Sequence, residues 1–145
     1  MSTTDKQLCW EWIKHHDLSP LCWITVTQRG SVQEEPWMAR VHRFLLKLSK
    51  YSGQHLGGIV SYETGNSTHS HILLLGERPI DHQFIEKRWK VGIVDCRSIG
   101  SQEEDVRRLV FYALKHPRLS LLRNFCPNPR KCTSPACCLI GSAGK

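Results

Sequence analysis

Four short segments of the chain either alternate between apolar and polar residues or run apolar throughout. They are rich in β-branched residues, so each predicts a β-strand. The four segments are residues 21–28, 56–63, 68–75 and 93–99. Polar residues 64–67 separate the second segment from the third and predict a hairpin loop.

Apolar residues recur at helical spacing in four further segments, which predict amphipathic helices. The first two helices are expected over residues 4–16 and 34–50, and Pro79 is expected to open the third. The fourth ends before Pro117, with Ser101 as its candidate N-cap. After the first helix the element order is β-α-β-β-α-β-α.

This order matches the split βαβ plan, so the expected fold class is α+β, with a ferredoxin-like antiparallel sheet. We expect the helices to pack on one face of that sheet and to leave the other face open. The chain divides into an N-terminal helical extension (1–19), a central domain (20–117) and a tail rich in cysteine and proline (118–145).

Charge narrows the class of partner. The 145 residues include 20 Lys and Arg against 13 Asp and Glu, giving a net charge of +7. Such an excess favours a polyanion, usually nucleic acid, although a basic surface alone also explains it. No apolar run has the ~20 residues of a membrane span. An odd number of cysteines, seven, behind an N-terminus without a signal sequence fits a reducing compartment.

His69 and His71 are the first candidates for chemistry. They lie two residues apart on a predicted strand, so both side chains point to one face. Either they are structural or they bind one metal ion. Glu63 ends the preceding strand, and the hairpin would bring it beside His69 either as a third ligand or as an exposed charge. Two imidazoles and a carboxylate suit Mn²⁺ or Mg²⁺.

Tyr112 and Lys115 lie three residues apart on the fourth predicted helix, and Arg108 lies one turn before Tyr112. Tyrosine is a weak nucleophile at neutral pH, but nearby cations favour the phenolate. The alternative interpretation is a tyrosine half-buried against the sheet, with Lys115 in solvent.

Three segments, in order, resemble motifs of the His-hydrophobic-His endonucleases, and specifically the nuclease domain of single-tyrosine rolling-circle replication initiators. The first is the strand segment at residues 23–28. The second is His69-Ser70-His71, and the third is the Tyr-x-x-Lys pattern from Tyr112 to Lys115. Ser70 departs from the family, which usually has an apolar residue there. That side chain should face away from the metal, so the change concerns packing.

The resemblance implies a metal-dependent nickase and strand transferase for single-stranded DNA at a replication origin. Tyr112 would form a 5′-phosphotyrosine, Lys115 would stabilise charge, and the metal would lie on His69, His71 and Glu63. Candidate DNA contacts are Trp23, Thr25, Thr27, Arg29 and Arg108. Core packing is the competing role for Trp23.

The same residues leave alternatives open. A small transposase or a mobilisation relaxase would use the same site. A ferredoxin-like module that only binds nucleic acid would leave the histidines and Tyr112 unexplained. Because no helicase segment follows the nuclease segment, an initiator of this kind would either be a nuclease alone or work with a separate helicase. It would act in the cytoplasm, or in the host nucleus if a eukaryotic virus encodes it.

The tail contains a second candidate metal site. Its four cysteines would supply thiolates for a structural Zn²⁺: Cys126, Cys132, Cys137 and Cys138. Their spacing differs from the usual pairs of Cys-x-x-Cys, so free thiols in a loop are the alternative.

Overall fold

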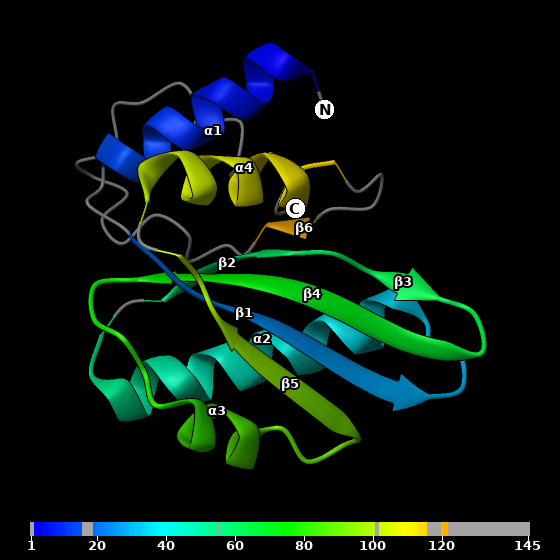
Figure 1. Ribbon diagram of the computed structural model, residues 1–145. Helices are drawn as coiled ribbons and strands as arrows, with labels where there is room; N and C mark the ends of the chain where they lie inside the picture. Colours follow the sequence, from blue (N-terminus) through cyan, green and yellow to red (C-terminus); the bar gives the residue numbers. More distant parts are fainter. Residues whose placement is uncertain (1, 16–18, 55, 101, 116–119, 122–145) are drawn as a thin grey trace.

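The computed structural model describes residues 2–15, 19–54, 56–100, 102–115 and 120–121. The elements in chain order are α1 (Thr3–His15), β1 (Ser19–Arg29), α2 (Glu34–Ser52), β2 (Gly57–Val60), β3 (Glu63–Thr64), β4 (Ser67–Gly76), α3 (His82–Arg88), β5 (Ile93–Ser98), α4 (Glu103–Ala113) and β6 (Ser120–Leu121). Figure 1 shows an antiparallel sheet between two layers of helices.

The strand order confirms the predicted fold class. The sheet runs β5-β1-β4-β2-β6, with β3 paired to β4. Its four principal strands follow the split βαβ plan, because β4 lies antiparallel between β1 and β2 while β5 pairs with the outer side of β1. The long central strands β1 and β4 therefore carry the residues from which both faces are built.

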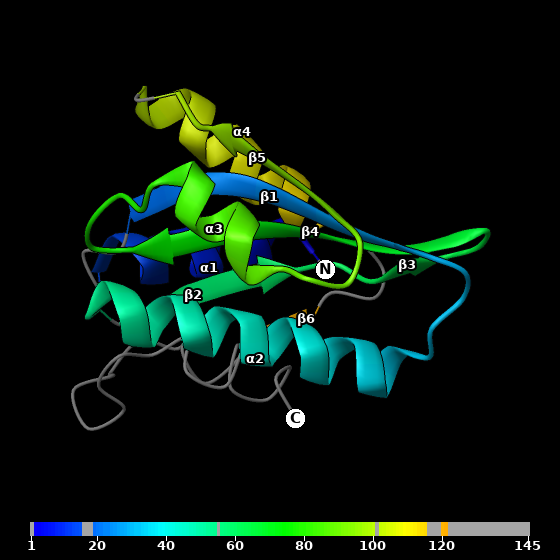
Figure 2. The same ribbon diagram turned by 90° about the horizontal axis from the view of Figure 1, so that it is seen from below.

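The first face of the sheet packs against α2 and α3 (Figure 2). Alternation along β1 turns Cys22, Ile24 and Val26 to this face, and all three are buried. The apolar stripe of α2 covers them with Trp37, Val41, Phe44, Leu45 and Leu48. Gly53 ends α2 at φ 66°, a left-handed conformation that glycine adopts without strain.

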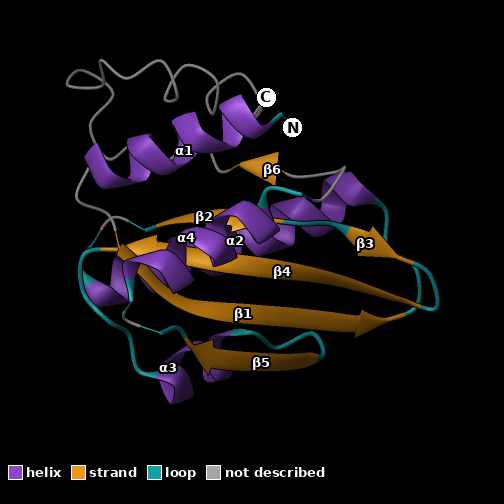
Figure 3. Ribbon diagram, turned by 45° about the horizontal axis from the view of Figure 1, so that its top comes forward, coloured by secondary structure: helices purple, strands orange, loops and turns teal. Residues whose placement is uncertain are grey.

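The second face is partly covered, which corrects the expectation of helices on one face alone. Leu73 and Leu75 of β4 are fully buried there in a cluster with residues of α1 and α4. An 11-residue helix is roughly 16 Å long and a 10-residue strand about 33 Å, so α4 cannot cover β4 completely. Figure 3 shows β3 and the adjoining ends of β1 and β4 extending beyond α4.

Some boundaries differ from the sequence prediction. The strand expected over 56–63 is divided into β2 and β3, and the residues between them, Ser61 and Tyr62, are buried. The N-cap of α4 is Gln102, with no capping hydrogen bond from its side chain. Ser101, the predicted N-cap, lies outside the described residues. Among the helices that are described, none combines the length and apolar character of a membrane span.

Candidate metal and nucleophile site

Glu63, His69 and His71 converge on the uncovered half of the second face. The β3–β4 register places Glu63 directly opposite His69. Glu63 Oε2 lies 2.8 Å from His69 Nε2 and 3.4 Å from His71 Nε2. One ligand atom from each residue lies within 4.8 Å of the others, so the three side chains are arranged to hold one cation.

Thr25 fixes the orientation of His71. The two residues are paired across β1 and β4, and Thr25 Oγ1 lies 3.1 Å from His71 Nδ1. On the backbone side, Ser61 Oγ accepts a hydrogen bond of 2.9 Å from the His71 amide. The sequence predicted a DNA contact for Thr25. In the structure its hydroxyl group forms a hydrogen bond with the imidazole of a candidate metal ligand.

Glu63, His69 and His71 are called the triad below. Ser70 points away from it, as its position between the two histidines requires. It is fully buried on the opposite face, where its hydroxyl accepts a 2.8 Å hydrogen bond from the indole N–H of Trp37. The polar residue at this position therefore satisfies a buried donor from α2. It does not alter the ligand set.

Trp23 connects the triad with Tyr112. Its indole stacks on the His71 ring at a centroid distance of 5.5 Å and an interplanar angle of 28°. The same indole lies 6.0 Å from the Tyr112 ring, tilted by 50°. Trp23 is half-buried and also packs against the apolar cluster beneath α4, so core packing and a place in the site coincide in this residue.

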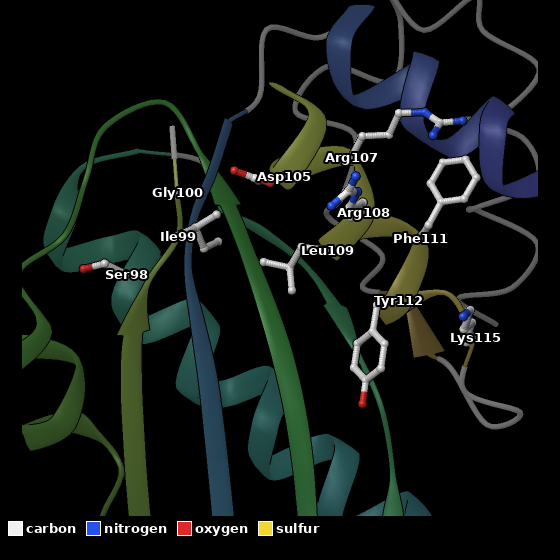
Figure 4. Close-up of a pocket in the computed structure, with 10 residues that line it drawn as sticks. All are labelled: Ser98, Ile99, Gly100, Asp105, Arg107, Arg108, Leu109, Phe111, Tyr112 and Lys115. Atoms are coloured by element: carbon white, nitrogen blue, oxygen red, sulfur yellow. The ribbon is translucent and has the colours of Figure 1, made fainter. Parts of the chain in front are cut away.

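Tyr112 lies near the end of α4 with 52% of its surface exposed. The apolar side of the helix faces the sheet through buried Val110, Ala113 and Leu114, which leaves Tyr112 at the margin. Figure 4 shows its side chain extending along the strands, with Lys115 to one side. Both residues line a cavity of about 660 Å³ between α4 and the end of β5.

The other residues proposed for DNA contact lie in separate places. Arg29 is exposed at the end of β1, opposite Ser67. Arg108 is exposed on α4 and lines the same cavity as Tyr112. Its Nε lies 3.7 Å from Glu104 Oε1. Thr27 is paired with His69 on the uncovered half of the sheet.

Sequence reasoning missed that β5 extends this open surface. Its register with β1 sets Ile93 beside Thr27, Asp95 beside Thr25 and Arg97 beside Trp23. All three β5 side chains are exposed, and Arg97 Nε lies 2.8 Å from Asp95 Oδ2. The alternation in 93–99 was the available signal, because it places these residues on one face. The four tail cysteines proposed for zinc lie outside the described residues.

Comparisons with known proteins give likeness of fold. No protein-family model matches the chain, and no curated protein matches it. Among solved structures, it is similar to the hypothetical protein ORF119 from Sulfolobus islandicus rod-shaped virus 1, with a TM-score of 0.51 and 18% sequence identity. The match covers 77% of this chain and 90% of the viral protein.

Proposed function

We propose that this protein is a divalent-metal-dependent endonuclease that nicks and rejoins single-stranded DNA through a 5′-phosphotyrosine on Tyr112. One observation carries the proposal. Glu63, His69 and His71 converge on the open half of the sheet, and Trp23 contacts the rings of both His71 and Tyr112. A ligand triad and a phenol held against one indole form a compact arrangement for phosphate chemistry.

The donor set fits a hard or borderline divalent cation. His69 and His71 offer imidazole nitrogen atoms and Glu63 offers a carboxylate, all partly accessible at the surface. Three protein ligands leave coordination positions for a phosphate oxygen, which favours Mn²⁺ or Mg²⁺. A bound ion would supply Lewis-acid polarisation of the scissile phosphate.

Tyr112 supplies the nucleophile. Its hydroxyl oxygen forms a bond to phosphorus and loses its proton, while the bond from phosphorus to the 3′ oxygen breaks and that oxygen leaves with a proton as a hydroxyl group. The DNA segment downstream of the nick remains attached to Tyr112 through its 5′ phosphate. Lys115, one turn further on, provides positive charge for the phosphate. A returning 3′ hydroxyl reverses the exchange and rejoins the strand.

Charge and exposed surface favour single-stranded DNA as the substrate. The chain has a net charge of +7, and the half-buried Trp23 borders the open half of the sheet, where a base can stack. As a replication initiator, the protein would act at an origin together with a separate helicase. It would work wherever its replicon is copied, in the cytoplasm or in a host nucleus.

A covalent-adduct assay tests the proposal. The full chain is incubated with single-stranded oligonucleotides of randomised sequence, labelled at either the 5′ or the 3′ end, with Mn²⁺ or with EDTA. We expect the 3′ label alone to become attached to the protein, in an SDS-resistant band that requires Mn²⁺. Sequencing the attached DNA identifies the cleaved site.

Tyr112→Phe is the matched control, because it removes one oxygen from an exposed ring and should leave the fold intact. We expect the adduct to disappear while DNA binding persists. Binding without any adduct in the wild-type chain would instead support a non-catalytic module. If the recovered sequences map to transposon ends rather than to an origin stem-loop, the protein is a transposase of the same chemistry.

A further inference from the structure

A second cluster of candidate ligands lies on the opposite face of the sheet from the triad. It comprises Cys22 on β1, Cys96 on β5 and His82, the first residue of α3. One sulfur or nitrogen atom from each residue lies within 4.8 Å of the others. Cys22 is buried, whereas Cys96 and His82 are half-buried, so the cluster has both an apolar floor and access from the surface.

The sheet register explains why these residues meet. Cys96 pairs with Ile24, and Cys22 pairs with Ser98, so the two cysteines are diagonal neighbours on one face of adjacent strands. The Cys22 thiol donates a hydrogen bond to Cys96, which raises the pKa of Cys22 and lowers that of Cys96. The two sulfur atoms lie within 4.8 Å of each other beneath α3.

We propose that Cys22, Cys96 and His82 bind a structural Zn²⁺ that fastens α3 to the β1–β5 edge of the sheet. Two thiolates and an imidazole are ligands that zinc prefers. Zn–S bonds of about 2.3 Å require sulfur atoms about 3.8 Å apart at a tetrahedral site, and the observed spread of at most 4.8 Å needs little contraction.

Glu86 is the candidate for the fourth position. It follows His82 by four residues on α3, so the two side chains lie on one side of the helix. Its carboxylate is exposed, and its charge raises the pKa of the Cys96 thiol, against the hydrogen bond from Cys22 that lowers it. A carboxylate or a water molecule from the surface would complete four-coordination.

A metal at this site would add to the packing that holds α3 on the sheet. This helix has seven residues, too few to be stable alone. The strand beneath it, β5, pairs with β1 and forms an edge of the described sheet. A metal that joins one residue from each of α3, β1 and β5 would stabilise all three against local unfolding.

Cobalt substitution tests the proposal. The full chain carries Ser in place of Cys126, Cys132, Cys137 and Cys138, so that the tail contributes no thiolate, and is titrated with Co²⁺ under reducing conditions. We expect one equivalent to give thiolate charge-transfer absorption in the near ultraviolet together with intense tetrahedral bands in the visible, both reversed by Zn²⁺. Cobalt on Glu63, His69 and His71 gives no thiolate band, so the two sites are distinguished.

Single substitutions in this background assign the ligands. Cys96→Ser should remove about half of the charge-transfer absorption, and His82→Ala should weaken Co²⁺ binding at least about tenfold while both thiolates remain. Cys9→Ser is the matched control. Cys9 is buried in the apolar cluster formed with α1 and α4 on the second face of the sheet. Burial raises its pKa to about 11, so its loss should leave the spectrum unchanged.

The proposal is overturned if the folded tail variant shows no thiolate band with Co²⁺, or if Cys22 and Cys96 are recovered as a disulfide that excludes metal. Should the tail variant fail to fold, the comparison is made in the intact chain. There, Cys96→Ser must lower the charge-transfer absorption and Cys9→Ser must not, and equal spectra would reject the site. Neither result depends on nuclease activity.

Discussion

The hydrogen bond between Thr25 and His71 engages Nδ1 and turns Nε2 of the imidazole toward Glu63. When Nδ1–H donates to Thr25 Oγ1, 3.1 Å away, the lone pair of Nε2 faces Glu63. A metal ligand is usually held in this way by a partner on its other ring nitrogen. Thr25 therefore positions His71, although it is not itself a ligand.

Replacing Thr25 with Val retains the shape of the side chain and removes this hydrogen bond. We expect Thr25→Val to weaken Mn²⁺ binding by roughly tenfold, since partners of metal ligands typically contribute 10–100-fold in affinity. Binding is measured by titration of the Tyr112→Phe protein, so that no cleavage intervenes.

Thr27→Val is the matched control for this measurement. Thr27 lies on the same strand and face, paired with His69, and it has no side-chain hydrogen bond within the described residues. It should leave Mn²⁺ affinity unchanged. Equal losses in the two variants would mean that Thr25 acts through packing rather than through His71.

Ser70 has a role in stability rather than in metal binding. Its replacement by Ala would leave the Trp37 indole N–H buried without an acceptor. We expect Ser70→Ala to lower the free energy of unfolding by about 1–3 kcal/mol, measured by urea denaturation, with Mn²⁺ affinity unchanged. Ser98 on β5 is exposed, so Ser98→Ala should lower the free energy of unfolding far less. A similar decrease in both variants would argue against the Trp37 interaction.

At the scale of elements, β1 organises both candidate sites. Its alternation sends Trp23 and Thr25 to the triad on one face and Cys22 to the cysteine cluster on the other. A shift of one residue in its register with β4 would exchange the two faces and destroy both arrangements. The buried Ile24 and Val26 fix that register through the core beneath α2.

Trp23 should control how Tyr112, the proposed nucleophile, lies relative to the triad. We expect Trp23→Ala to slow adduct formation by about 100-fold, because displacement of a reacting group by about 1 Å has effects of that size. Trp23→Phe retains an aromatic ring between His71 and Tyr112 and should be much less impaired. The rate of adduct formation at saturating DNA is the measurement, and equal rates for the two variants would contradict a positioning role.

The sequence predicted the elements well because their patterns are local. Alternation identified β1 and β4, and the apolar stripe of α2 matched its buried residues. The packing of α1 and α4 on the second face was missed, because the apolar residues Leu73 and Leu75 follow the two histidines in a nearly continuous run. Such a run does not reveal where one face changes from buried to open.

For the candidate site, sequence reasoning predicted the close approach of Glu63 to His69, since a hairpin of known length sets that register. The partners of His71 could not be predicted in this way. Thr25 and Trp23 reach it across β1, 46 and 48 positions earlier in the chain, and their contact depends on the register of two strands that the chain does not join directly. The same holds for Cys22 and Cys96.

At the scale of the whole molecule, the sheet separates two sets of ligands with different chemistry. The triad offers imidazole and carboxylate on the face that remains open, and the second cluster offers thiolates beneath α3. Thiolates favour Zn²⁺ over Mn²⁺, whereas imidazole and carboxylate accept either ion, so Mn²⁺ should bind at the triad and not at the cysteine cluster. Removal of Mn²⁺ should therefore leave the cysteine cluster loaded with Zn²⁺.

Under the proposed function, the net charge of +7 should make DNA affinity depend on salt, and the slope of that dependence would report how many phosphates the protein contacts. For single strands, log K falls with log[salt] with a slope of about −0.7 for each phosphate neutralised. We expect Arg29→Gln to reduce the steepness of this slope by about 0.7, because Arg29 lies exposed at the open end of β1. Binding is measured by fluorescence anisotropy with the Tyr112→Phe chain.

The matched control, Lys50→Gln, removes one charge from the last turn of α2, on the covered side of the sheet. It should leave the slope unchanged. If the slope falls equally in the two variants, DNA affinity depends only on the total charge of the protein. The uncovered half of the sheet is then not where the strand binds.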